Sequence, residues 1–433
     1  MSEPTPQKSE DQKSEDQKSE DQKPEEAALT ESAENSETNQ DTVRWTNAFR
    51  EITSGNALLS VLAVVLAILI GGVLIALTDS DVQDAAGYFF ARPWDLFAAI
   101  GSAVGGAYLA LFQGSVYDFR RDDFLSAIKP LTQTLVFATP LIAAGLGVAI
   151  AFRVGLFNIG GRGQIIVGAA FAGYASFAWD LPIVIHVVVA VIMGIIGGAL
   201  WGAIAGLLKA RTGAHEVIVT IMLNYVAYYL ISFLLRTDLL KNPGSNNPKT
   251  PPAADSAVLP PLFGDAFKLH WGFIVVIAGT VLAWWLIERS SLGFKFRAVG
   301  LNPHAARVAG IKVERLYVYV MLIAGGYAGL AASTEVLGTT TSGFTSGVDA
   351  GIGFDAITVA LLGRSTPWGT FAAGILFGAF KAGGFTMQAS QSIPIDIVLV
   401  VQSLIVLFIA APPLVRAVFR LPQPGARATK AVS

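Results

Sequence analysis

The chain has no cysteine among its 433 residues, and its four histidines lie far apart. These absences exclude a disulfide, a thiolate metal site and a cysteine nucleophile, and the histidine spacing does not indicate a metal cluster. Charged residues are also scarce, at 14%, whereas apolar residues make up 53%. Several apolar runs approach the length that crosses a bilayer, so the composition predicts an all-α polytopic membrane protein.

The chain also lacks the Gly-x-x-x-x-Gly-Lys-Ser/Thr loop that cradles nucleotide phosphates. The nearest string, which starts at Gly244, has the wrong spacing. No nucleophile, base and orienting group follow a recognised spacing either. We therefore predict that this chain is not an enzyme, that it binds no metal or cofactor, and that nucleic acid is not its partner.

Acidic charge is concentrated at the start of the chain. Residues 1–42 carry a net charge of −9, and the remainder carries +7. The unit Lys-Ser-Glu-Asp-Gln recurs three times between Lys8 and Gln22, with almost no large apolar residue nearby. Such a segment cannot bury enough surface to offset the entropy lost on ordering. We predict a disordered cytoplasmic tail over residues 1–42, with a docking tail as the alternative, and a basic cytoplasmic tail over residues 416–433.

Ten apolar runs, most of them about 20 residues long, predict membrane-spanning helices. The runs cover residues 57–77, 131–151, 165–182, 184–208, 216–236, 271–288, 317–337, 350–363, 366–386 and 394–414. We expect the first run to be retained as a signal anchor. An eleventh run, residues 97–113, is weaker and rich in Gly and Ala. We expect it to lie outside the bilayer or to enter it only partly.

With ten spans, the basic loop residues fall mostly on one face of the membrane. They include Arg153, Arg162, Lys209, Arg211, Arg364 and the basic residues between Arg289 and Arg315. The opposite face receives residues 114–130 and 237–270, each with three basic and three acidic side chains. The positive-inside rule then places both termini in the cytoplasm. If residues 97–113 spanned fully, a re-entrant segment near residues 152–165 would be needed.

A polar stripe interrupts one of the apolar runs. Glu216, Thr220 and Asn224 are four residues apart and therefore share one face of a helix. A stripe facing lipid would leave hydrogen-bonding groups unsatisfied, so we expect it to face a pore, a cavity or a neighbouring helix. For Glu216 the alternative is an acidic residue favoured at a helix N-terminus by the dipole.

The segment between Phe157 and Gln164 breaks two apolar runs with three glycines, two amides and a cation. Such a break frees backbone groups that can line an aqueous path or bind a polar solute. A plain turn connecting two helices is the alternative.

The loop over residues 293–311 contains a second organised feature. Pro303 suits the first turn of a helix, Asn302 suits its cap, and Gly310 suits its end. These residues predict a two-turn helix on the cytoplasmic face that presents small alanines to a groove on a soluble partner. The alternative is an interfacial helix held to anionic lipid by its basic residues.

Four strings, in order along the chain, resemble a known family. They are Pro140 to Leu146, Leu156 to Gly160, Glu216 to Tyr225, and the Gly353-Phe-Asp-Ala-Ile string with its continuation to Gly369. The chain is similar over about residues 55–415 to the integral-membrane permease subunits of bacterial ATP-binding-cassette importers. Within the branched-chain amino acid, ribose and nucleoside group, it most resembles the nucleoside permeases, also called simple-sugar permeases.

The resemblance implies a permease domain over residues 55–415 in the cell membrane, with ATP used by partner subunits. It implies a partner ATPase, a second and similar permease chain that forms a heterodimer, an extracytoplasmic solute-binding lipoprotein, and the lipid bilayer. The loop would hold the coupling helix that docks on the ATPase. The coupling residues would be Arg297, Gly300, Asn302, Pro303, Ala305, Ala306 and Gly310. One departure is Arg162, where the family usually has an acidic residue.

A nucleoside is neutral, with an aromatic face and several hydroxyls, so its path needs aromatic surfaces and amide or hydroxyl partners. The predicted pathway residues are Phe157, Asn158, Gln164, Glu216, Thr220, Asn224, Tyr225, Tyr228 and Phe354. We expect Asn224, about 12 Å along its helix from the cytoplasmic end, to lie near mid-membrane and line the path. Bundle packing is the alternative for each aromatic residue.

Three other functions stay open from the sequence alone. A permease for ribose or another monosaccharide would share the same architecture. An ion-coupled secondary transporter should show inverted repeats and carboxylates in mid-span, which are scarce here. A scaffold protein would have no transport cycle.

Overall fold

The computed structural model describes residues 56–420, and within them the elements are helical, with a single isolated β-bridge between Pro261 and His270. The prediction of an all-α polytopic membrane protein is confirmed. Residues 64–411 form one compact unit that holds every site discussed below. The predicted acidic tail, residues 1–42, and most of the predicted basic tail lie outside the described residues.

Eight helical segments of the described chain are long and apolar enough to cross a membrane. They are α3 (Asn56–Thr78), α5 (Pro93–Ser115), α6 with α7 (Phe124–Ala127, Lys129–Arg153), α9 (Ile183–Thr212), α10 (Glu216–Leu234), α11 with the π-helical turn η2 (Gly272–Trp284, Trp285–Arg289), α14 with the π-helical turn η3 (Val313–Thr334, Glu335–Thr339) and α16 (Pro367–Gln391). The shorter apolar helices are α8 (Gly161–Ala178), α15 (Ile352–Leu362) and α17 (Ile395–Ala410). Each of the ten predicted runs coincides with one of these helices.

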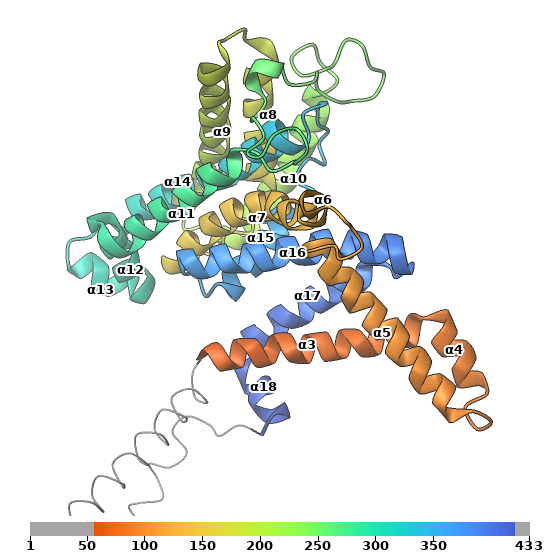
Figure 1. Ribbon diagram of the computed structural model, residues 1–433. Helices are drawn as coiled ribbons and strands as arrows, with labels where there is room; N and C mark the ends of the chain where they lie inside the picture. Colours follow the sequence, from red (N-terminus) through yellow and green to blue (C-terminus); the bar gives the residue numbers. More distant parts are fainter. Residues whose placement is uncertain (1–55, 421–433) are drawn as a thin grey trace, which may run out of the picture. The chain divides into compact units, whose positions relative to one another are not determined.

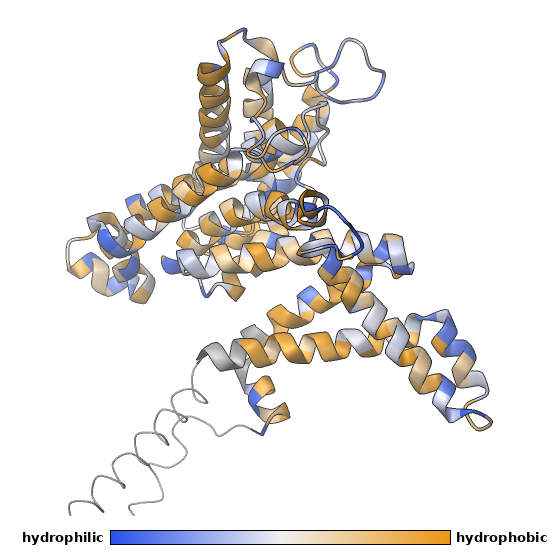
Figure 2. Cartoon of the chain, viewed as in Figure 1, coloured by the Kyte–Doolittle hydropathy of each residue, from blue (hydrophilic) through white to orange (hydrophobic). Residues whose placement is uncertain are grey.

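The remaining elements are short; α18 follows the last apolar helix, and the others lie in connections between apolar helices (Figure 1). They are α4 (Ser80–Gly87), the 3₁₀ turn η1 (Asp255–Ala257), α12 (Ser291–Leu301), α13 (Pro303–Val308) and α18 (Pro412–Val418). Figure 2 shows hydrophilic residues gathered on α4, on α12 with α13, and on the loops, whereas the long helices are mainly hydrophobic. This division is the one expected of a chain whose helices contact lipid.

The weak run over residues 97–113 forms part of α5, a 23-residue helix that qualifies as a span by length and composition. We had expected this run to lie outside the bilayer or to enter it only partly. Its length and composition instead allow a full crossing. Its packing is nevertheless one-sided. Gly106 faces Gln391 and Gly114 faces Thr386 on α16, whereas a methyl group at Gly101 would meet no other atom within 4 Å. The C-terminal half of α5 is the part that packs against α16.

Small residues bring the central helices together. On α9 and α14, methyl groups at Gly198 and Gly329 would overlap the backbone of the opposite helix. Lipid leaves no hydrophobic driving force between helices, so close packing of small residues stabilises their association instead. Serine also contributes, since the hydroxyl of Ser333 donates to the carbonyl of Gly329 and lies 3.4 Å from that of Val191. These contacts hold α9 and α14 close together.

Two helices begin inside the bundle and not at its edge. The chain leaves α7 at Arg153, turns back through residues 154–160, and starts α8 at Gly161. Residues 340–351 likewise lead from η3 to the start of α15, and the two starts meet, since a methyl group at Gly353 would overlap the backbone of Arg162. Breaks of this kind are tolerated in membrane proteins where protein buries them or a cavity solvates them.

This arrangement corrects the predicted position of Arg162. We expected it to lie with Arg153 on the cytoplasmic face. Arg153, at the end of α7, indeed donates to the carbonyl of Ser365 and contacts Gly300 of α12. Arg162 instead pairs with Asp349, which follows the far end of α14. We had assigned Arg162 to the cytoplasmic face because we took residues 152–165 to be an ordinary connection between two spans.

Candidate functional site

An ion pair joins the start of α8 to the segment that precedes α15. The guanidinium Nε of Arg162 lies 3.2 Å from Oδ1 of Asp349. The Asp349 side chain is 4% exposed, and that of Arg162 is 32% exposed. The guanidinium also lies 5.4 Å from the ring centroid of Tyr228 on α10, in a cation–π contact. Three elements therefore converge on one charged residue, and we call this place the α8–α10–α15 junction.

The pairing keeps the junction close to electrically neutral. The second carboxylate oxygen of Asp349 accepts from the backbone N–H of Gly351 at 3.3 Å. Removing a charge from water is tolerated only when a partner and hydrogen bonds replace the solvent. The reversed charge at Arg162, relative to the pattern of the family, is thus matched by a carboxylate on another element.

Further charged side chains lie near the junction. The carboxylate of Asp355 is attracted by Lys381 and repelled by Asp349. Lys381 also attracts Glu335, which accepts a hydrogen bond from the Thr340 hydroxyl at 3.0 Å. Ionisable groups within membrane proteins are rare and usually functional.

The sequence analysis missed these three carboxylates when it judged mid-span acids to be scarce. Glu335 belongs to the π-helical turn that ends α14, Asp349 lies in a connection, and Asp355 lies in the first turn of α15. None interrupts the middle of a long apolar run. The available signal was the Gly353-Phe-Asp string, which contains Asp355.

The predicted amides serve the backbone of the helix break. Asn158 and Gln164 bond each other at 3.1 and 3.2 Å, and Asn158 also accepts from Gly160 N–H. Both are buried, at 1% and 2% exposure. The two side-chain amides satisfy each other's hydrogen bonds, so neither is free to bind solute in this conformation. The break is thus organised by side chains and is more than a plain turn.

Asn224 has a similar role and does not line an open path. Its Oδ1 accepts from Gly163 N–H at 2.8 Å, and its Nδ2 donates to the Ile159 carbonyl at 2.9 Å. It is 4% exposed, and Thr220, 1% exposed, donates to the Glu216 carbonyl at 2.8 Å. The polar stripe faces a neighbouring segment, one of the alternatives given above, since Asn224 satisfies backbone groups at the start of α8 and Thr220 packs beside Gly160.

Glu216 lies apart from the junction, at the first position of α10. Its carboxylate pairs with Lys209 Nζ at 2.8 Å, and the side chains are 12% and 24% exposed. This geometry favours the helix N-terminal alternative over solute contact.

The accessible pathway candidates are aromatic. Phe157, Tyr225 and Phe354 are 44%, 53% and 49% exposed, and Phe157 stacks on Phe152 with ring centroids 4.6 Å apart. Of the predicted aromatic residues, Tyr228 lies against Arg162 and so offers flat apolar surface beside hydrogen-bonding charge. Such a combination suits a neutral solute with a ring and hydroxyl groups. Within residues 56–420, no group of three or more His, Asp or Glu side chains could hold a metal ion.

The predicted helix in the cytoplasmic loop is present as α13. Asn302 Oδ1 accepts from the N–H groups of His304 and Ala305 at 2.9 and 3.1 Å, and Gly310 has a φ of 80°. Ala306, however, is 4% exposed and packs inward, so it is not presented as we expected. Its N–H and carbonyl bond Asn302 and Ile311.

Other residues occupy the outward face of this loop. Leu301 and Val308 are 88% and 92% exposed. Arg297 donates to the Ile287 carbonyl, and a methyl group at Gly300 would overlap the Arg153 carbonyl. Docking on an ATPase remains a prediction for the loop, and the side chains placed to make it are apolar ones that the sequence analysis did not select.

Comparison with known proteins agrees with this architecture. The guanosine ABC transporter permease protein NupP of Bacillus subtilis is 39% identical over 76% of this chain and 97% of its own length. The glucose ABC transporter permease protein TsgB13 of Haloferax volcanii is 32% identical over 71% of this chain and 83% of its own. A second guanosine permease protein of Bacillus subtilis, NupQ, is 27% identical over 59% and 80%. No solved structure gives a significant match.

The model of one protein family matches residues 131–410, which include α7 through α17 and hence the junction and the α12–α13 loop. The chain therefore belongs to the family described as the permease component of the branched-chain amino acid transport system.

Proposed function

We propose that this chain is the membrane permease subunit of an importer that passes nucleosides across the cell membrane. The observation that carries the proposal is the 39% identity to a guanosine permease protein over 97% of that protein's length. ATP hydrolysis would be supplied by separate subunits. This chain would provide the path and the surface that receives the motion of the ATPase.

The α8–α10–α15 junction supports a neutral solute with a ring. Arg162 and Asp349 are paired with each other, so neither offers a free charge to an ionised solute. Phe354 and Tyr228 supply ring faces, and the paired Arg162 and Asp349 supply donors and acceptors suited to sugar hydroxyls.

The proposed complex contains an ATP-binding-cassette ATPase, an extracytoplasmic solute-binding lipoprotein and a second permease chain. Two guanosine ABC transporter permease proteins of one organism match this chain at different identities, 39% and 27%. A heterodimer explains why a single transporter would have two such chains. Co-purification with a tagged copy of this chain tests the assembly, and recovery of a homodimer alone would contradict it.

A sugar permease is the second candidate, because the glucose permease protein TsgB13 is 32% identical over 83% of its length. The hydroxyl chemistry would be shared, but a sugar has less use for the exposed rings of Phe354 and Tyr225. Transport measurements therefore have to decide whether the solute is a nucleoside or a sugar.

The deciding experiment measures uptake of radiolabelled guanosine, uridine, ribose and glucose by cells without this chain and after it is restored. We expect loss and recovery of nucleoside uptake only. Loss of ribose or glucose uptake with normal nucleoside uptake would move the assignment to sugars.

A further inference from the structure

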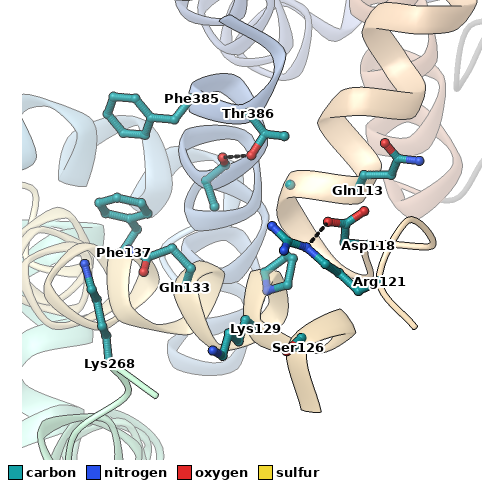
Figure 3. Close-up of a pocket in the computed structure, with 13 residues that line it drawn as sticks. Gln113, Asp118, Arg121, Ser126, Lys129, Gln133, Phe137, Lys268, Phe385 and Thr386 are labelled. Carbon is teal, nitrogen blue, oxygen red and sulfur yellow. Dashed lines mark hydrogen bonds and ion pairs between the residues drawn. The ribbon is translucent and has the colours of Figure 1, made fainter. Parts of the chain in front are cut away.

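A basic recess lies apart from the α8–α10–α15 junction, at the end of the bundle where α5 ends and α7 begins. It is a cavity of about 510 Å³, a size typical of small-ligand sites. Figure 3 shows Phe137, Phe385 and Lys268 on one side of it, with Lys129 and Arg121 towards the other. The recess also brings the two loops that we predicted to share the extracytoplasmic face to a single place.

The charge of the recess is unbalanced. Asp118 is the one acidic residue in its lining, and it pairs with Arg121 at 3.2 Å. Within residues 56–420, neither Lys129 nor Lys268 forms an ion pair. Nearby Asp123 is occupied in capping α6, where it accepts from Ser126 N–H at 3.2 Å. Lys129 and Lys268 are therefore the two cations of the lining that no carboxylate of the described chain pairs with.

Uncharged donors in the same lining have no partner. Gln113 is 6% exposed, yet its amide forms no hydrogen bond with any described residue, and the same holds for the amide of Gln133. The unbonded amide atoms of both residues are accessible, and each can donate to a ligand. Amide and ammonium donors around one recess are the set that binds phosphate oxygens.

The surface beside the recess indicates where the phosphate comes from. Phe119 and Phe124 are each 63% exposed, and Leu125 is 58% exposed. Tyr117 contacts both phenylalanines, with ring centroids 5.1 and 6.5 Å away. Exposed aromatic residues at the ends of apolar helices mark the level of the lipid headgroups. The recess thus offers cations and amide donors at headgroup level, with apolar walls at Phe137 and Phe385 for the rest of a lipid.

We propose that this recess binds the phosphate group of an anionic phospholipid and holds the α5–α7 corner at the membrane surface. A soluble phosphate ester shares the chemistry, but it would have no use for the apolar walls and the adjacent exposed rings. The proposal does not depend on which solute the transporter carries.

Lipid titration of the purified transporter, followed by native mass spectrometry, tests the proposal. The probes are phosphatidylglycerol, phosphatidylcholine and glycerol phosphate. We expect preferential binding of phosphatidylglycerol, weakened roughly tenfold or more in K129Q/K268Q. The double substitution K129R/K268R keeps the charge and should keep the affinity. Lys241→Gln, in the same extracytoplasmic loop as Lys268 but outside the recess, is the matched control and should bind as the unaltered chain does.

Three outcomes would overturn the proposal. The first is equal phosphatidylglycerol affinity in K129Q/K268Q and the unaltered transporter. The second is glycerol phosphate binding as tightly as the lipid, which would assign the recess to a soluble ester. The third is binding to the isolated chain but not to the assembled transporter, which would assign the recess to a partner subunit.

Discussion

Arg162 and Asp349 show how much one residue at the junction depends on another. The Asp349 carboxylate is 4% exposed and relies on a guanidinium from a different element. Arg162→Ala would leave that carboxylate unpaired, and we expect a loss of roughly 1 to 3 kcal/mol of stability, less than for a fully buried pair because Arg162 is partly exposed. Thermal unfolding of the purified transporter measures it.

The exposed pair Arg307–Glu314, at 2.7 Å with both side chains nearly half exposed, provides the control. Arg307→Ala should change stability by less than about 1 kcal/mol. Equal effects of the two substitutions would mean that the Arg162 pair is no more than a surface contact.

Asn224 separates a structural role from a solute-binding role. Asn224→Leu would strand Gly163 N–H and the Ile159 carbonyl, at about 1 to 3 kcal/mol for each buried group. We expect lower thermal stability together with lower uptake. Tyr225→Leu, at the next and exposed position, should leave stability unchanged. Normal stability in Asn224→Leu would contradict a structural role for the hydrogen bonds of Asn224 to Gly163 and Ile159.

His270 makes stability depend on pH. Burial lowers the pKa of His270 to about 4 from its ordinary value near 6.5, and its Nδ1 accepts from Gly272 N–H at 3.2 Å. The unfolded chain binds a proton below about pH 6.5 and the folded chain does not. Stability is therefore complete above about pH 6.5 and falls towards pH 4, by up to roughly 3 kcal/mol.

Thermal unfolding between pH 7.5 and pH 5 should show this loss in the unaltered chain and a flatter profile in His270→Gln. His215→Gln, at an exposed position, should keep the slope of the unaltered chain. Identical slopes in all three proteins would remove His270 as the cause.

At the scale of elements, α13 and its flanks form the surface predicted to meet the ATPase. Leu301→Asp and Val308→Asp change side chains that are 88% and 92% exposed, so the fold should survive while ATPase retention falls. Co-purification of the ATPase measures the effect. Gly300→Ala is unsuited to the purpose, because it would push α12 away from the end of α7. Full ATPase retention in the double substitution Leu301→Asp/Val308→Asp would exclude this surface.

The helices also show which features of the fold could be predicted from the sequence. Apolar runs predicted the helices because length and hydropathy are local properties, and Asn302, Pro303 and Gly310 predicted α13 because capping is local too. The return of residues 154–160 into the bundle could be predicted only conditionally, because it depended on whether residues 97–113 cross the membrane, and their weak hydropathy did not decide that. Partners across the chain, such as Asp349 for Arg162, depend on that return and were missed for the same reason.

At the scale of the whole molecule, two features serve different ends of the bundle. The junction gathers residues from the start of α8, the segment before α15 and the middle of α10, where the ring of Tyr228 contacts Arg162. The α12–α13 loop lies beside the end of α7, where Gly300 contacts Arg153. A movement of the loop would therefore reach α7 and the chain break that follows it, a connection suited to coupling ATP hydrolysis to access.

The most direct measurement is guanosine import by the whole transporter in proteoliposomes, comparing Phe354→Ala with Phe385→Ala. The two phenylalanines are 49% and 48% exposed, but only Phe354 lies at the junction. If a nucleoside base contacts this ring, Phe354→Ala should raise the KM for guanosine by about tenfold, while Phe385→Ala leaves it unchanged. Guanosine import with an unaltered KM in Phe354→Ala would contradict a nucleoside path through the α8–α10–α15 junction.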